Sequence, residues 1–327
     1  MMPAMLSGVL FALTAGLMWG LVFVAPLMLP DYPAALLTTG RYLAFGLLAL
    51  PLALMDRTSL RELRAPDWWA AVRLSAVGNF LYYLTLAAAI QRAGAPLPTM
   101  LIGTLPVVIA ICANHRNRVR DGQLPWLRLL PGLLLIAAGL LLVNRTELAE
   151  LQAAGAGPEA LRRYVEGGLL AVIAVACWTW YPIRNADWLR EHADRSPRAW
   201  ATAQGLVTLP MALLGMAVVG AVQARWPGLL MPADFGWPSG PRPPNYLGLM
   251  LAIGLFSSWL GTLCWNEASQ RLPTSLSGQL IVFETLAALA YAFLWQGRWP
   301  PTITLAGIAL LVAGVVSALR IKPVAAH

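Results

Sequence analysis

The chain has 327 residues, of which 58% are apolar and only 12% are charged, and its mean hydropathy is +0.64. These values lie far outside the usage of soluble domains, so lipid must be the solvent for most of the chain. The net charge of +8 comes from basic residues that are dispersed among short loops and form no continuous stripe. A nucleic-acid partner is therefore not expected.

Apolar stretches follow one another almost without pause from Met5 to Arg320. A helix that crosses a hydrocarbon core of about 30 Å needs about 20 mainly apolar residues. The first run is too long for the apolar part of a signal peptide and is interpreted as a span. The sequence therefore predicts an all-α integral membrane protein with ten transmembrane helices. The predicted spans are 5–28, 33–55, 68–90, 94–114, 125–143, 167–186, 200–222, 246–266, 275–295 and 301–320.

Basic residues indicate how these spans are oriented. An even number of spans puts both termini on one side, and thirteen Arg and Lys residues fall in the segments on that side, against seven on the other. By the positive-inside rule, both termini are expected in the cytoplasm of a bacterial-type inner membrane.

Matching residues recur along the chain at offsets that change only where a loop is longer. Gly8 and Trp19 match Gly167 and Trp178 at an offset of 159, Gly46 and Pro51 match Gly205 and Pro210 at the same offset, 89–92 match 268–271 at 179, and Gly132 and Gly139 match Gly307 and Gly314 at 175. These matches predict a duplication. The expected units are a five-helix repeat over 1–145, a connecting loop over 146–165 and a second five-helix repeat over 166–322.

A five-helix unit ends on the side of the membrane opposite to its start, so the second copy must be inverted. Inverted repeats in secondary transporters surround a site near the bilayer midplane, and rocking of the halves opens it alternately to each side. The alternative interpretation is a channel or scaffold built from the same repeats.

The pattern resembles the EamA type of the drug/metabolite transporter superfamily. The residues that carry the resemblance are Gly8 to Trp19, Arg41-Tyr42, Ala87–Ala89, Pro106, and Gly132 and Gly139 with their counterparts Gly307 and Gly314. Among the branches it most resembles the YddG-like exporters of aromatic and other amino acids. The resemblance implies a cavity lined by helices 1–4 and 6–9, with helices 5 and 10 packed outside. Two departures are Gly297-Arg298, where many relatives have Gly-Glu, and Glu284, near an expected proline.

Two ionisable residues lie inside predicted spans. Placing an ionisable group within the bilayer costs several kcal/mol, so such a residue is first interpreted as functional. At 1.5 Å per residue, Arg41 lies about 12 Å below the outer face and Glu284 about 14 Å above the inner face. The two side chains could pair with each other, or bind the carboxylate and the ammonium group of a substrate. Structural pairing for Glu284 and snorkelling for Arg41 are the competing explanations.

Polar and aromatic residues share one face of three predicted helices. They are Ser75, Asn79, Tyr82 and Tyr83 in helix 3, Trp178, Tyr181 and Asn185 in helix 6, and Ser258, Thr262 and Asn266 in helix 8. Such faces suit a cavity that holds a partly apolar solute, although hydrogen bonds between helices would explain them equally well in helix 8. The predicted substrate-binding residues are Asn79, Tyr82, Tyr83, Trp178, Tyr181, Glu284 and Arg41.

Pro106 and Pro182 are expected to kink their spans, as hinges or as part of the cavity wall, and helix packing alone is an equal explanation. Small residues in helix 10 permit close helix contact, so a monomer or a weak homodimer through helices 5 and 10 is expected.

A membrane-embedded enzyme is the competing class of function. His115, His192 and His327 all lie outside the predicted spans, and no aspartate lies within one. Because these residues supply the usual catalytic and metal sites, neither an enzyme nor a cofactor or metal is expected. The predicted function is export of small metabolites, above all amino acids including aromatic ones. Efflux of cationic drugs and transport of other metabolites are the alternatives.

Overall fold

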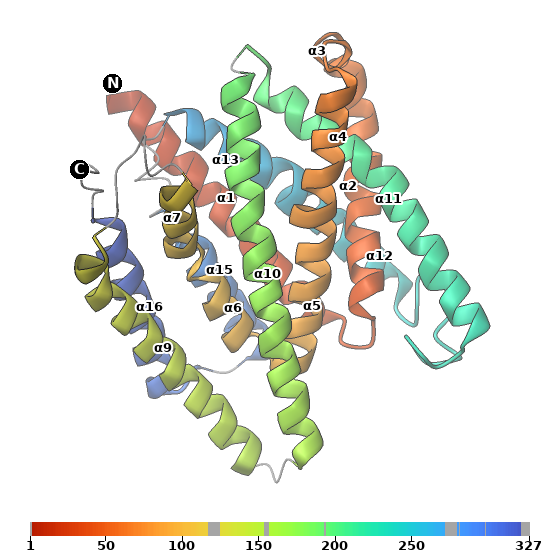
Figure 1. Cartoon of the computed structure of the whole chain (residues 1–327). Coiled ribbons are helices and arrows are strands. Elements are labelled where there is room, and N and C mark those ends of the chain that lie inside the picture. Colours follow the sequence, from red (N-terminus) through yellow and green to blue (C-terminus); the bar gives the residue numbers. More distant parts are fainter. Residues whose placement is uncertain are drawn as a thin grey trace.

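The computed structural model describes residues 2–116, 125–153, 157–192, 194–271, 280, 282–297 and 299–321. Every regular element in these residues is a helix (Figure 1). The expectation of an all-α fold is thus confirmed.

The first part of the chain forms a series of helices of unequal length. They are α1 (Met2–Met28), α2 (Ala34–Met55), α3 (Arg57–Arg61), α4 (Ala65–Leu74), the π-helical segment η1 (Ser75–Leu81), α5 (Tyr82–Ala93), α6 (Pro96–Ile102), α7 (Leu105–Arg116) and α9 (Trp126–Ala153). The second part is also helical. Its elements are α10 (Pro158–Glu191), α11 (Pro197–Arg225), α12 (Pro243–Ala252), the π-helical segment η2 (Ile253–Leu260), α13 (Gly261–Arg271), α15 (Val282–Gln296) and α16 (Thr302–Leu319).

Six helical segments in the described residues are long and apolar enough to cross a membrane. They are Leu6–Met28, Ala34–Met55, Ala65–Ala93, Trp126–Glu150, Pro197–Arg225 and Pro243–Ala268. Three shorter apolar helices, Pro96–Ile109, Val282–Gln296 and Thr302–Ala318, add to these. The predicted span 275–295 falls partly outside the described residues.

Proline residues set many of the helix starts. Pro66, Pro96, Pro158, Pro197 and Pro243 each occupy one of the first two helical positions. Proline suits these positions because its fixed φ is helical and the missing N–H would have had no partner within the helix. The helix starts therefore follow directly from the sequence.

The segment 146–165, predicted to be a connecting loop, is mostly helical instead. Helix α9 continues to Ala153 and α10 begins at Pro158. Residues 146–153 include Glu, Leu, Ala and Gln, which are good helix formers, so the helix continues beyond its apolar stretch.

Glycines bring two pairs of helices into close contact. A Cβ atom added at Gly139 of α9 would lie 2.5 Å from the carbonyl oxygen of Gly307 in α16, and one added at Gly314 would lie 2.6 Å from that of Gly132. Between α2 and α11, a Cβ at Gly46 would lie 2.7 Å from the Leu209 side chain. The small-residue face of α16 is thus used inside the chain, against α9.

The remaining long helices surround the centre of the molecule. Helix α1 packs against α15 and α13, and α10 packs against α5. In Figure 1 α9 and α16 lie side by side at one edge of the molecule, away from α2 and α11. This arrangement leaves α1, α2, α5, α10 and α11 around a common interior.

Candidate functional site

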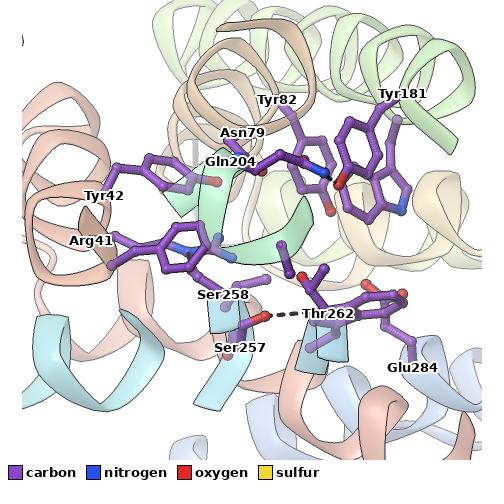
Figure 2. A pocket seen from close by; sticks show the side chains of 15 residues that line it. Arg41, Tyr42, Asn79, Tyr82, Tyr181, Gln204, Ser257, Ser258, Thr262 and Glu284 are labelled. Carbon is purple, nitrogen blue, oxygen red and sulfur yellow. Dashed lines mark hydrogen bonds between the residues drawn. The ribbon is translucent and has the colours of Figure 1, made fainter. Parts of the chain in front are cut away.

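A cavity lies in this interior, lined by α1, α2, η1, α5, α10, α11, η2, α13 and α15 (Figure 2). Its volume is about 20 Å³, which is roughly the space that one water molecule needs. The side chains that line it are Trp19, Val22, Arg41, Tyr42, Phe45, Asn79, Tyr82, Trp178, Tyr181, Ala201, Gln204, Ser257, Ser258, Thr262 and Glu284.

Arg41 is a buried cation with an incomplete set of partners. Its Nε donates a hydrogen bond of 2.9 Å to Ser258 Oγ, and its Cζ lies 4.5 Å from the ring centroid of Tyr83 and 5.0 Å from that of Tyr42. The rings offer cation–π attraction and limit the positions of the guanidinium. Nη1 is buried and has no hydrogen-bond partner among the described residues. The Nη1 group of Arg41 therefore has hydrogen-bonding capacity that no described residue uses.

Glu284 is the carboxyl group of the cavity. The residue is 2% exposed, and its Oε2 finds no hydrogen-bond partner in the described part of the chain. Within those residues no ion pair joins Glu284 to Arg41, and Figure 2 shows the two side chains on different sides of the cavity. A buried carboxyl group without a partner is costly unless it is protonated or binds a cation.

Aromatic rings form one wall of the cavity. The Trp178 ring lies between those of Tyr82 and Tyr181, with centroid separations of 4.7 and 4.9 Å and interplanar angles of 22° and 8°. Trp19 meets Trp178 edge-on at 5.9 Å. A Cβ at Gly78 would lie 2.2 Å from the Tyr181 ring, so only glycine lets this ring pack on η1.

The two π-helical segments bring polar groups to the cavity. Asn79 comes from η1, and Ser257 and Ser258 come from η2. In η2, Ser258 Oγ donates to Ile253 O at 3.3 Å, while Ser257 O accepts from Trp19 Nε1 at 3.0 Å. Short π segments are frequent at functional sites because they re-aim side chains and free carbonyl groups.

A second, larger cavity of about 430 Å³ lies where α5 ends and α10 begins. Charged side chains line it, with Arg92 Nε 3.6 Å from Glu166 Oε2 and Arg162 Nη2 2.8 Å from Glu159 Oε1. The hydrogen bond from Arg162 holds the pKa of Glu159 below its ordinary value. Apart from Pro33, the residues that line this polar cavity lie outside the predicted spans.

Comparisons with known proteins show what kind of molecule carries this cavity. Residues 6–145 match the EamA-like transporter family. The chain is 54% identical to the inner membrane protein YtfF of Escherichia coli K12 over 98% of its own length and 97% of that protein. The chain belongs to the EamA-like transporter family. The resemblance seen in the sequence is thereby confirmed.

Two further comparisons are informative. A probable terminal-alkyne amino-acid exporter of Streptantibioticus cattleyicolor is 31% identical over 138 residues, which cover 38% of this chain and 46% of the exporter. A solved crystal structure covers 95% of this chain and 96% of its own, with a TM-score of 0.59 and 19% identity. That structure shares the fold.

Six of the seven side chains predicted to bind substrate line the central cavity. They are Arg41, Asn79, Tyr82, Trp178, Tyr181 and Glu284. The seventh, Tyr83, lies against the Arg41 guanidinium and is fully buried. Pro106 is the second residue of α7 and follows the break after α6, whereas Pro182 lies inside the continuous helix α10.

Of the other polar residues on the predicted helix faces, some line the cavity and others form hydrogen bonds between helices. Ser258 and Thr262 line the cavity. Ser75 and Asn266 instead bond to backbone carbonyl groups of α11, those of Gln204 and Pro197, at 3.3 and 3.5 Å. Asn185 also bonds to α11.

Four notable lining residues were not among the predicted binding residues: Trp19, Tyr42, Gln204 and Ser257. Trp19 could have been expected from the sequence, because it matches Trp178 in the predicted repeat. Gln204 could also have been expected, because it is a polar side chain within an apolar span. For Ser257, only the π geometry brings the residue to the cavity.

Proposed function

We propose that this chain is a secondary transporter that exports small metabolites, above all amino acids including aromatic ones, across the bacterial inner membrane. Membership of a transporter family supports this, as do an inner-membrane relative that matches almost the whole chain and a partial relative described as a probable amino-acid exporter. The same relatives support a role other than that of an enzyme, and we propose no cofactor.

The observation that carries the proposal is the combination of Arg41 and Glu284, two buried residues on different sides of one cavity. Each has a buried atom, Nη1 and Oε2 respectively, without a hydrogen-bond partner among the described residues. Arg41 suits a carboxylate, because a guanidinium presents its N–H groups in a fork that matches the two oxygens. Glu284 suits an ammonium group. The stacked rings of Tyr82, Trp178 and Tyr181 suit an apolar or aromatic side chain between the two charged ends.

We also propose ten membrane-crossing helices in two inverted five-helix repeats, with repeat limits near 1–145 and 166–322 and both termini in the cytoplasm. Three observations support this architecture. Glycines matched by the repeat face each other between α9 and α16. The π segments η1 and η2 interrupt corresponding helices. The family match ends at residue 145. The excess of basic residues on one side supports the orientation.

The size of the cavity supports alternating access. A volume of about 20 Å³ cannot hold an amino acid, so the walls must separate before a substrate enters. Inverted repeats give a way to do so, by rocking one half against the other. The surrounding partner is membrane lipid. The chain is proposed to act as a monomer or a weak homodimer through the outer faces of α9 and α16.

Efflux of lipophilic cations is a second candidate, favoured by Glu284 beside an aromatic wall. Aromatic faces and a carboxylate together attract organic cations. Arg41 distinguishes the candidates, since a buried guanidinium in the same cavity repels a cation but attracts a zwitterion's carboxylate.

Counterflow in proteoliposomes tests the proposal with a panel of amino acids, quaternary ammonium compounds and nucleotide sugars. We expect the parent protein to exchange amino acids. In Arg41→Leu the exchange rate should fall roughly 10- to 100-fold, since a hydrogen bond to a charged group contributes about 1.5–3 kcal/mol. Arg41→Lys keeps the charge and should retain part of the exchange. Arg73→Leu removes an exposed arginine elsewhere and is the matched control. Exchange of a lipophilic cation without any amino acid would favour the second candidate.

A further inference from the structure

One face of α10 runs from the central cavity to the end of the helix near α3 and α4. Tyr181, Asn185, Trp188 and His192 follow at intervals of four, three and four residues, which places them on one side of a helix. Tyr181 lines the cavity, and His192 is the residue that follows the end of α10. In Figure 1 this end of α10 lies at the top of the molecule, where α11 begins.

Buried hydrogen bonds tie this face to α11. Tyr181 Oη donates to Gln204 Oε1 at 2.8 Å, and Gln204 Nε2 donates to Asn185 Oδ1 at 3.2 Å. Trp200 Nε1 donates to the same oxygen at 2.8 Å. These four side chains are at most 8% exposed. They form an unbroken polar relay from the cavity to Trp200.

A cluster of rings and one carboxylate continues from the relay to the end of the molecule. Trp188 stacks on Trp200 with centroids 3.5 Å apart, and His192 stacks on Trp188 at 4.5 Å. Asp67 of α4 accepts a hydrogen bond of 3.1 Å from Trp188 Nε1, and its Oδ1 lies 3.4 Å from His192 Nε2. The cluster, defined as Asp67, Trp188, His192 and Trp200, fills the space between α4, α10 and α11.

We propose that Gln204 and Asn185 are positioning residues that couple Tyr181 in the cavity to this cluster, which closes the cytoplasmic end. The inference rests on the proposed alternating access and on the proposed orientation. Separation of α10 from α11 breaks the relay bonds together, because each group lies in a dry interior and finds a new partner only if water enters. The relay therefore has two stable conditions, closed and dry or open and hydrated. A substrate that displaces the Tyr181 hydroxyl shifts the balance between them.

The test measures access to the cavity directly. Thr262, a lining residue on α13 outside the relay, is replaced by Cys in a full-length chain whose Cys112, Cys177 and Cys264 are replaced by Ser. A membrane-impermeant maleimide is added to inside-out vesicles, and the labelling rate is measured without any amino acid. We expect Gln204→Met and Asn185→Leu each to raise this rate at least about tenfold, because each removes two bonds of the relay and the loss of one buried hydrogen bond corresponds to about a tenfold shift.

A double-mutant cycle separates coupling from general loosening. Tyr181→Phe removes only the bond from Tyr181 to Gln204, whereas Gln204→Met removes this bond and the bond to Asn185, so Tyr181→Phe should give a part of the increase seen in Gln204→Met. The double variant should label no faster than Gln204→Met, because that substitution already removes the bond that Tyr181→Phe removes. Thr179→Val is the matched control: its buried hydroxyl bonds within α10, to Val175 O at 2.7 Å, so the parental rate is expected. If Gln204→Met fails to fold, Tyr181→Phe alone still carries the test.

Two results would overturn the inference: parental labelling in Gln204→Met or Tyr181→Phe, and a double variant whose increase is the product of the single increases. Because the assay contains no substrate, its outcome does not depend on which metabolite is carried. If the variants label faster as expected while amino acids show no exchange in the counterflow assay, the coupling stands and the proposed substrate is wrong.

Discussion

Arg41 and Glu284 differ in how the protein restrains them. Ser258, Tyr42 and Tyr83 hold the Arg41 guanidinium in place, whereas Glu284 Oε2 lacks any hydrogen-bond partner in the described chain. A fixed cation orients the carboxylate of a zwitterion. The carboxyl group opposite is then free to exchange a proton for the ammonium group, because burial strongly disfavours the ionised form without a cation.

This difference predicts proton coupling through Glu284. A proton and the ammonium group of the substrate compete for one carboxylate. Export should therefore accelerate when protons flow down their gradient in the direction opposite to that of the substrate. Glu284→Gln keeps the shape of the side chain but cannot titrate. We expect its export to lose the dependence on an imposed pH gradient while counterflow at equal pH persists at lower affinity. Gradient dependence equal to that of the parent in Glu284→Gln would remove this role.

At the scale of the element, the contact between α9 and α16 depends on backbone proximity. Gly132, Gly139, Gly307 and Gly314 bring carbonyl oxygens to within 2.5–2.9 Å of where a Cβ would stand. Backbone atoms cannot move aside as a flexible side chain can. The tight contact therefore requires glycine on both helices.

Gly139→Ala should accordingly destabilise the protein. The new Cβ would lie 2.5 Å from Gly307 O and 2.9 Å from Leu311 N, so the two helices must separate, at a cost of about 1–3 kcal/mol. Thermal unfolding of the purified protein in detergent measures the loss. Gly248→Ala in α12 is the control, because no atom lies within 4 Å of the added Cβ there. Equal midpoints for the two variants would show that the helices tolerate the side chain.

The same scale shows what the sequence could predict. Apolar stretches and their prolines predicted the helices, because lipid requires every backbone group to bond within its own segment. The cost of a polar group in lipid identified Arg41 and Glu284. The π segments could not be predicted, because one extra residue in a helical turn changes neither composition nor hydropathy. Nor could the bonds of Gln204, since its partners Tyr181 and Asn185 lie on a helix that only tertiary packing brings near.

For the whole molecule, polar contacts join the proposed halves at both ends. At one end Asp56 pairs with Arg198 at 3.2 Å and Asp67 bonds to Trp188. At the other, Asp31 Oδ2 lies 2.8 Å from Arg242 Nη2. With both ends bridged and little free volume between them, the structure corresponds to a closed state. The proposed alternating access would require each set of contacts to open in turn.

A covalent link across one end should therefore stop transport even though neither linked residue lines the central cavity. Asp31→Cys with Arg242→Cys, in the background without native cysteines, is linked by a short reducible thiol crosslinker, and counterflow is measured before and after reduction. We expect exchange to fall to the protein-free background when linked and to recover on reduction, because opening toward the outer side is half of the cycle. Glu159→Cys with Arg162→Cys is the matched control. Its parent pair is also 2.8 Å apart but lies within α10, so linking it leaves the halves free to separate. Parental exchange in the linked Asp31–Arg242 variant would exclude movement at this end as part of the transport cycle.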